Sequence, residues 1–201
     1  VYTAPFFVAL GAHWLLKGDR LNRHKVTGLL LAFAGVVALF VKDLGALSLS
    51  ALPGDLMALV AGALWGATTL YIKKYLSRRT VPLQTLFYQV FFSAPLLVLM
   101  SLALENPVVS KLSFIAGFSV FYQCLIVAFL SYLAWFSLIH RHPVSRLHAC
   151  SFFTPVFGVF LSGALILHEL SSSNLVIALT LVSIGMILVN YRPESRKTRA
   201  R

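Results

Sequence analysis

Charged residues are scarce in this chain. Asp, Glu, Lys and Arg make up 11% of the 201 residues, against about 25% in a typical soluble domain, and 59% of the residues are hydrophobic. This balance excludes an ordinary water-soluble domain. Cysteine is scarce as well. Cys124 and Cys150 both lie in apolar stretches, which excludes a secreted disulfide framework and predicts two small core residues.

The hydrophobic residues come in long blocks. About 20 mainly apolar residues cross a hydrocarbon layer of about 30 Å as a helix, and a backbone in lipid must satisfy its own hydrogen bonds. The sequence therefore predicts an all-α integral membrane protein with seven spans, at residues 1–16, 26–42, 55–73, 83–104, 114–139, 147–167 and 174–191. The first block has no initial Met and is about 24 Å long as a helix, so we expect it to be the end of a span that begins upstream.

The basic residues are concentrated on one side of the predicted membrane. All of the 17 Lys and Arg residues except Lys42 and Lys111 fall in alternate connections or in the C-terminal tail. This is the distribution that the positive-inside rule describes, so it predicts a cytoplasmic C-terminus in a bacterial inner (plasma) membrane. The net charge of +11 then reflects topology and does not require a nucleic-acid partner. A contact of the tail with lipid headgroups or nucleic acid is the alternative interpretation.

An internal repeat relates the two ends of the chain. Residues 4–40 align with residues 154–190 at an offset of 150, without a gap. The aligned pairs include Pro5 with Pro155, Asp19 with Glu169, Gly28 with Ala178 and Gly35 with Gly185. A repeat of this length in a membrane chain is typical of a transporter built from duplicated halves.

The repeat also predicts the division of the chain. Residues 1–42 are expected to be the last hairpin of a first repeat, 43–54 a linker, 55–191 a complete second repeat and 192–201 a basic cytoplasmic tail. The second repeat holds five spans, which is an odd number, so two such halves must face opposite ways in the membrane. We therefore predict an inverted repeat of five-helix halves, with three helices of the first half outside this sequence.

Three stretches resemble the EamA-type drug/metabolite transporters. They are LMALVAGALWG at residues 56–66, SYLAWFSLIHRHPVSRLHACSFFTP at residues 131–155, and the closing hairpin at residues 155–189 with its Glu and late Gly. The resemblance implies a ten-helix protein of which the visible spans are helices four to ten. It also implies movement of small metabolites, including amino acids, without catalytic chemistry.

Polar residues inside the predicted spans are the candidates for a solute site, because polar groups are expensive in lipid and usually face the bundle. One such stripe, Thr85, Gln89 and Ser93, repeats every four residues on one helix face. The candidate substrate-binding residues are Trp65, Thr69, Tyr88, Gln89, Gln123, Tyr132, Trp135, Ser151 and Thr154. The alternative for a Ser or Thr is a hydrogen bond that holds helices together, and for a Trp it is packing or anchoring at the interface.

A second set of residues is expected to shape or gate the bundle. The prolines should kink their spans because they lack a backbone donor, and the acids lie at breaks where a carboxylate favours the positive end of the next helix. The glycines should let helices approach closely, within the chain or in a homodimer. These residues are Pro95, Pro155, Asp19, Glu169, Gly35 and Gly185.

No Asp, Glu, Lys or Arg lies at the centre of a predicted span. The visible sequence therefore gives no evidence for proton coupling, which usually needs a buried titratable group. His13 and His148 lie nearer the inner ends and are expected to be polar residues close to loops. The same absence argues against a retinal photoreceptor and an intramembrane protease, and the sequence predicts no enzyme activity, metal or cofactor.

The sequence thus predicts a permease or exporter that works by alternating access. Its apolar, aromatic spans suit a small organic metabolite with an apolar part, such as an amino acid or an amphiphilic compound. A sugar phosphate would require basic residues in the cavity, and none is visible. The alternatives left open are a non-transporting scaffold or decayed fragment and, less favoured, a seven-helix receptor.

Overall fold

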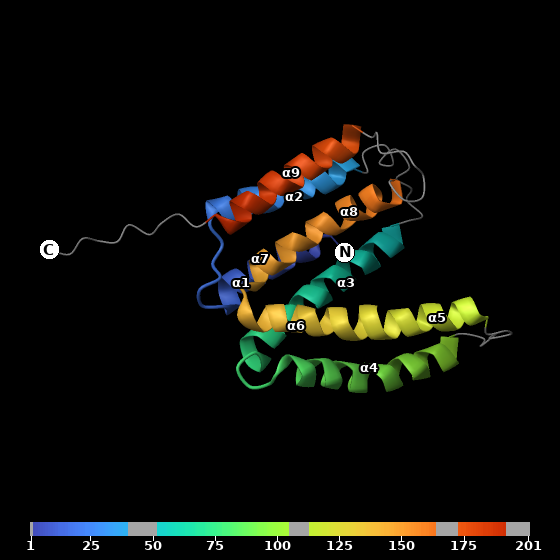
Figure 1. Cartoon of the computed structure of the whole chain (residues 1–201). Helices are drawn as coiled ribbons and strands as arrows, with labels where there is room; N and C mark the ends of the chain where they lie inside the picture. Colours follow the sequence, from blue (N-terminus) through green and yellow to red (C-terminus); the bar gives the residue numbers. More distant parts are fainter. Residues whose placement is uncertain (1, 40–51, 105–112, 164–172, 192–201) are drawn as a thin grey trace. The chain divides into compact units, whose positions relative to one another are not determined.

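Every regular element in the described part of the chain is a helix (Figure 1). The computed structural model describes residues 2–39, 52–104, 113–163 and 173–191. The α-helices are α1 (Ala4–Leu15), α2 (Arg23–Leu39), α3 (Leu52–Tyr71), α4 (Pro82–Leu104), α5 (Phe114–Tyr122), α6 (Tyr132–Arg141), α7 (Val144–Ala149), α8 (Phe153–Ser162) and α9 (Ser173–Asn190). The π-helical segments η3 (Ile72–Leu76) and η4 (Gln123–Ser131) and the 3₁₀ turn η5 (Cys150–Phe152) join some of them without a break. The predicted all-α class is confirmed.

Within the described residues, four continuous helices are long and apolar enough to cross a membrane. They are Leu52–Leu76, Pro82–Leu104, Phe114–Arg141 and Val144–Ser162. The other predicted spans correspond to α1, α2 and α9, which are shorter or less apolar over the described residues. Glu169, the tail at 192–201 and most of the linker at 43–54 lie outside the described residues.

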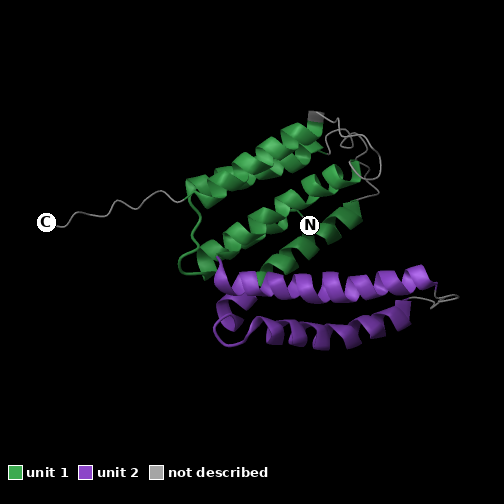
Figure 2. Ribbon diagram, viewed as in Figure 1, with its two compact units in different colours: residues 1–70, 143–201 green, residues 71–142 purple. Residues whose placement is uncertain are grey.

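The chain forms two compact units (Figure 2). Unit 1 comprises residues 1–70 and 143–201, and unit 2 comprises residues 71–142. Unit 1 therefore contains α1, α2, α7, α8, α9 and nearly all of α3, while unit 2 contains α4, α5 and α6 with both π segments.

The core of unit 1 lies around α2 and α9, which run side by side (Figure 1). Its buried residues are Ala9, Leu29, Ala32, Val36, Ala149, Phe152, Val156, Leu175, Ala178, Val182, Met186 and Val189. Several of them are Ala or Val, so the side chains between the two helices are small. Close approach of helices through small residues maximises van der Waals contact where lipid supplies no hydrophobic driving force.

The small residues that the internal repeat aligns also lie in the contact between α2 and α9, where each faces a member of the other aligned pair. A Cβ added at Gly28 would lie 2.5 Å from the carbonyl oxygen of Gly185, and one added at Gly35 would lie 2.9 Å from that of Ala178. At the offset of 150, Gly28 corresponds to Ala178 and Gly35 to Gly185, so each contact is the image of the other. Residue numbers increase along α2 from Gly28 to Gly35, while those of the facing residues on α9 decrease from Gly185 to Ala178. The two helices are therefore antiparallel. Because this contact within the chain occupies the glycines, a homodimer would have to use another face.

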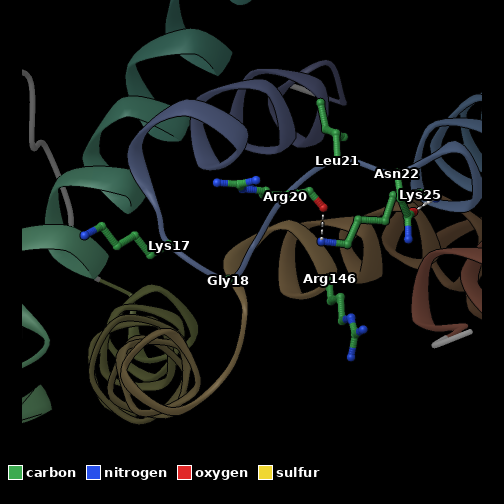
Figure 3. Close-up of a pocket in the computed structure, with 7 residues that line it drawn as sticks. All are labelled: Lys17, Gly18, Arg20, Leu21, Asn22, Lys25 and Arg146. Carbon is green, nitrogen blue, oxygen red and sulfur yellow. Dashed lines mark hydrogen bonds between the residues drawn. The ribbon is translucent and has the colours of Figure 1, made fainter. Parts of the chain in front are cut away.

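The turn between α1 and α2 has its own local signals (Figure 3). Gly18 has a φ of 99°, in the left-handed region that a residue with a Cβ rarely adopts. The backbone N–H of Lys25 donates to Asn22 Oδ1 over 2.8 Å, so Asn22 caps the first turn of α2. The conformation of the α1–α2 turn is therefore set by residues of the turn itself.

In unit 2, α4 packs along α6. The ammonium of Lys73 donates to the carbonyl oxygens of Ile139 (2.7 Å) and His140 (3.0 Å), which lie in the last turn of α6. A cation at the end of a helix stabilises the free carbonyls there. At the other end of the same continuous helix, Ser113 Oγ accepts the N–H of Ala116 and caps α5.

One irregular helical segment lies beside a proline, where the sequence predicts a distortion, and another contains no proline. The 3₁₀ turn η5 lies just before Pro155, which lacks the N–H that a regular helix would use. α4 runs from Pro82 to Leu104 without a break at Pro95. The longest irregular segment, η4, contains no proline and begins at Gln123, so the side-chain pattern gave no sign of it.

The expectation of two core cysteines is wrong. Cys124 and Cys150 are both exposed. The physical reason is that the outer face of a membrane helix meets lipid, so a small apolar side chain there gains nothing by being buried in protein.

Candidate functional site

A buried polar cluster links α3 and α7 within unit 1. His148 is 0% exposed and Thr69 is 2% exposed, and the distance from His148 Nε2 to Thr69 Oγ1 is 3.0 Å. The His148 ring also packs against the indole of Trp65, with 4.9 Å between ring centroids. Two of the predicted site residues are therefore brought together, and a residue of α7 joins them.

The Thr69 hydroxyl takes part in two hydrogen bonds of this cluster. Thr69 Oγ1 donates to the carbonyl oxygen of Trp65 on its own helix over 3.1 Å. The same hydroxyl also shares a hydrogen bond with His148 Nε2, and the tautomer of the imidazole decides which of the two groups donates. The cluster thus presents an imidazole whose orientation is fixed by a hydroxyl on the neighbouring helix, beside an aromatic face.

His148 lies close to the connection that precedes α7, as expected, but its side chain is buried. It lies four residues into α7, on the same buried face as Ser145, Ala149 and Phe152. The spacing of 145, 148, 149 and 152 is that of one helix face, so the signal was present in the sequence. Its partner on α3 could not be read from the sequence, because 79 residues separate Thr69 from His148.

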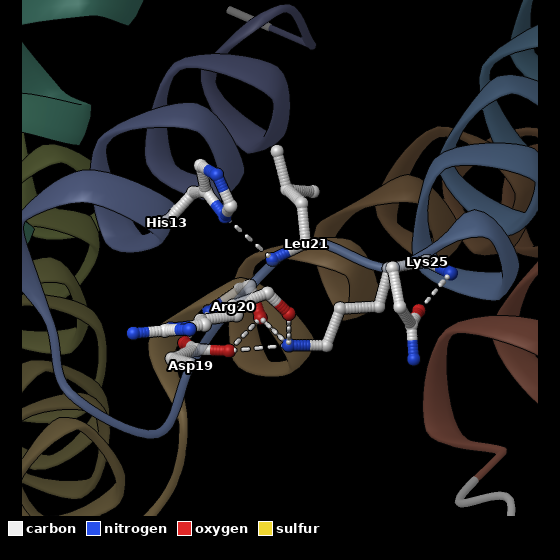
Figure 4. Close-up of polar contacts among 7 residues, drawn as sticks. His13, Asp19, Arg20, Leu21 and Lys25 are labelled. Carbon is white, nitrogen blue, oxygen red and sulfur yellow. Dashed lines mark hydrogen bonds and ion pairs between the residues drawn. The ribbon is translucent and has the colours of Figure 1, made fainter.

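A second buried network ties the α1–α2 turn to the start of α7 (Figure 4). Asp19 is 4% exposed and Lys25 is 6% exposed, and Lys25 Nζ lies 2.6 Å from Asp19 Oδ1. Lys25 also donates to the carbonyl oxygen of Arg20 (3.0 Å) and to Ser145 Oγ (3.1 Å). Ser145 donates its backbone N–H to Asp19 Oδ2 over 3.0 Å and its hydroxyl to Asp19 Oδ1.

This network changes the role expected for Asp19. The carboxylate accepts from the first turn of α7, 126 residues away in sequence, whereas Asn22 caps the helix that follows it. Burial acts to raise the pKa of Asp19, but hydrogen bonds from Lys25 and Ser145 and the charge of Lys25 outweigh it, so the pKa of this carboxyl lies below its ordinary value. The Asp19 carboxylate therefore remains charged at neutral pH, and its hydrogen bonds join the turn to α7.

The remaining candidates on unit 1 do not join the cluster. Ser151 Oγ donates to the carbonyl oxygen of His148 over 2.7 Å, so its hydroxyl is used within its own helix. Thr154 is exposed, and Pro155 is buried in the first turn of α8.

The candidates on unit 2 lie mainly on exposed faces. Gln89, Gln123, Tyr88 and Tyr132 are exposed, and Trp135 is half-buried. Within the stripe on α4, Thr85 is buried and lies 3.1 Å from Thr80 Oγ1, whereas Ser93 Oγ bonds within its own helix. Gln123 differs from the others because it opens the π segment η4, and π segments are frequent at functional sites.

No group of three or more His, Cys, Asp or Glu residues that could hold a metal ion occurs in the described ranges. The site instead offers one imidazole, one hydroxyl and an indole in an apolar helical unit. Such a set can form hydrogen bonds with a polar group of a solute. The long apolar helices define this protein as an integral membrane protein with helical spans. The buried cluster shows that some of these helices carry polar side chains that face other helices.

The family follows from comparison with known proteins. Residues 52–191 match the model of the EamA-like transporter family, so the chain belongs to that family. The earlier resemblance to EamA-type transporters is confirmed. No solved structure matches the chain.

The relatives span a longer sequence than this chain. The chain is 25% identical over 197 residues to "Uncharacterized transporter YoaV" of Bacillus subtilis (strain 168), covering 98% of the chain and 66% of that protein. It is 28% identical over 204 residues to a "Probable amino-acid metabolite efflux pump" of Salmonella typhimurium, covering 97% of the chain and 66% of that protein. A similarly named protein of Escherichia coli (strain K12) is 25% identical over 202 residues, covering 96% of the chain and 66% of that protein. The chain thus spans slightly less than two thirds of these relatives.

Proposed function

We propose that this protein exports a small organic metabolite with an apolar part, such as an amino acid, through a site built around the Trp65–Thr69–His148 cluster. The observation that carries the proposal is the burial of an imidazole and a hydroxyl inside an apolar helical unit. Buried polar groups at membrane depth are expensive and are retained where they serve a solute path. The relatives named as amino-acid metabolite efflux pumps support the solute class.

The chemistry of the cluster suits this solute. An imidazole can exchange hydrogen bonds with a carboxylate or an amine, and the indole of Trp65 offers a face to an apolar side chain or a cation. None of the three cluster residues is Lys or Arg, so a phosphorylated sugar would lack the charge partner that it needs. The other candidate site residues, above all Gln123 at the start of η4, are proposed to line the same path at later stages of transport.

Alternating access is the proposed mechanism. The crosswise contacts of Gly28 with Gly185 and of Gly35 with Ala178 are what two copies of one unit would make around a local two-fold axis. They support an inverted repeat of five-helix halves in which residues 55–191 form one complete half. Rocking of one such half against the other would expose the site to either side in turn. The distribution of Lys and Arg supports a bacterial inner-membrane location with a cytoplasmic C-terminus.

Efflux from cells tests the proposal. Cells that produce the protein are loaded with dipeptides, and the amino acids released into the medium are measured against time. Thr69→Val should lower efflux several-fold at unchanged membrane abundance, because it removes the hydroxyl that orients His148. Thr69→Ser keeps the hydroxyl and should retain efflux.

The matched control is the neighbouring threonine. Thr68 is exposed, and its Oγ1 donates to the carbonyl oxygen of Leu64 on its own helix over 2.9 Å. Thr68→Val removes the same atoms one position away and should leave efflux unchanged. Equal losses in Thr68→Val and Thr69→Val would place the solute path elsewhere. A wild-type protein that reaches the membrane and moves no amino acid or amphiphile would favour the scaffold interpretation.

A further inference from the structure

A basic hollow lies at the turn between α1 and α2 (Figure 3). It has a volume of about 610 Å³ and is lined by Lys17, Gly18, Arg20, Leu21, Asn22, Lys25 and Arg146. Four of these seven residues are cationic, and none is acidic. The nearest carboxylate, Asp19, is buried and already holds Lys25 and Ser145.

The charge of this hollow is not neutralised by the protein. Lys25 forms the ion pair with Asp19 and so adds little net charge. Lys17, Arg20 and Arg146 form no ion pair with any residue in the described ranges. The Nε of Arg146 is buried and has no hydrogen-bond partner within the same ranges, which is uncommon for a buried donor. The hollow therefore holds three positive charges available to an anion.

An apolar groove meets the basic hollow at Leu21. The groove has a volume of about 240 Å³ and runs between α1 and α2, lined by Phe6, Ala9, Leu10, Leu21, Val26, Leu29 and Leu30. Leu21 is the residue that lines both spaces. The cationic hollow lies at the end of two apolar helices, and the apolar groove continues along them. Together they are complementary to a phospholipid, which has an anionic headgroup followed by an acyl chain.

We propose that this composite site binds an anionic phospholipid. The headgroup phosphate lies among Lys17, Arg20 and Arg146, and one acyl chain lies in the groove between α1 and α2. The hollow alone would suit any phosphate compound, but the groove has no polar lining residue and would remain empty with a soluble phosphate. Basic pockets of membrane proteins at the level of the headgroups bind lipids of this class. The bound lipid would strengthen the position of the α1–α2 turn, which the Asp19–Lys25–Ser145 network ties to α7.

Native mass spectrometry of the protein in detergent tests the site. The titrants are dioleoyl phosphatidylglycerol, dioleoyl phosphatidylcholine and glycerol 3-phosphate. We expect binding of the first at the lowest concentration, because it alone supplies both a net negative charge and an acyl chain. Lys17→Gln with Arg20→Gln removes two exposed cations and should weaken binding by at least about tenfold, since each basic residue near an anionic lipid contributes a factor of about five.

The control removes two charges from another connection. Arg78 and Arg79 are exposed and lie outside the hollow, so Arg78→Gln with Arg79→Gln should leave phosphatidylglycerol binding unchanged. Equal binding of phosphatidylcholine, equal weakening in the two double variants, or binding of glycerol 3-phosphate as tight as that of the lipid would each overturn the proposal. The last outcome would assign the hollow to a soluble phosphate compound. The Lys17 and Arg20 side chains are exposed, so the variant tests binding without disturbing the folded core.

Discussion

Addition of one methyl group at Gly185 should loosen the contact between α2 and α9. A Cβ at this position would lie 2.5 Å from the carbonyl oxygen of Gly28 and 2.7 Å from the backbone nitrogen of Ala32. Both neighbours are backbone atoms, so neither can move aside by a change of rotamer. The helices must separate, and overpacking of this kind costs about 1–3 kcal/mol.

The size of the effect follows from two opposing terms. Replacement of a helical Gly by Ala stabilises a helix by up to about 1 kcal/mol, so the net destabilisation of Gly185→Ala should be about 1–2 kcal/mol. Gly158→Ala is the matched control, because Gly158 lies in helix α8 and has no atom within 4 Å of an added Cβ. That variant should be neutral or more stable than the wild type.

Thermal unfolding of the purified protein in detergent, followed by tryptophan fluorescence, measures both variants under the same conditions. Gly185→Ala should melt several degrees lower than the wild type, and Gly158→Ala should not. The double variant Gly28→Ala with Gly185→Ala should lose less than the sum of the two single variants, because both methyl groups enter one contact. Equal melting temperatures for Gly185→Ala and Gly158→Ala would refute the close contact between the two helices.

Four further predictions concern the buried pair, its dependence on pH, the solute path and the orientation of the C-terminus. Asp19→Asn leaves Lys25 buried without its partner and should destabilise the protein by about 3–5 kcal/mol, and Asp19→Asn with Lys25→Met should recover part of this loss in the same melting assay. Because the folded-state pKa of Asp19 is lowered, its contribution to stability is complete above the unfolded-state pKa of about 3.9 and is lost as the pH falls through the folded value. The melting temperature of the wild type should therefore fall below about pH 4 more steeply than that of Asp19→Asn, and parallel curves would contradict this. Gln89→Leu and Gln123→Leu should each lower efflux at normal membrane abundance, and normal efflux in both would remove these residues from the path. A reporter that is active only outside the cytoplasm should be silent when fused after Arg201, and activity there would contradict the proposed orientation.

Much of the fold could be predicted because helices in membranes are specified locally. Each apolar block carries its own hydrogen bonds and its own affinity for lipid, so its position along the chain is readable without knowledge of its neighbours. The prediction was less accurate at helix ends. The α7–η5–α8 helix begins at Val144 rather than at residue 147, because Pro143 can precede a first turn whose N–H groups need no partner on the same helix.

The candidate site was predicted only in part. Trp65 and Thr69 were selected for their spacing on one helix, and they do share a cluster. The sequence predicts that His148 lies near a loop, because few residues separate it from the helix end, whereas its burial depends on the rotation of α7 toward α3. Gln89 and Gln123 were selected because they are polar, and polarity alone does not indicate which side of a helix faces protein.

The sequence by itself determined that this protein is a helical membrane protein, where its apolar segments lie and which residues repeat, because these properties depend on runs of neighbouring residues. The tertiary structure alone decided that Thr69 meets His148 and that Asp19 meets Ser145, pairs separated by 79 and 126 residues. Such pairs depend on the rotation of each helix about its axis and on which helix lies beside it. Both are set by packing of many side chains at once, and no local pattern contains that information.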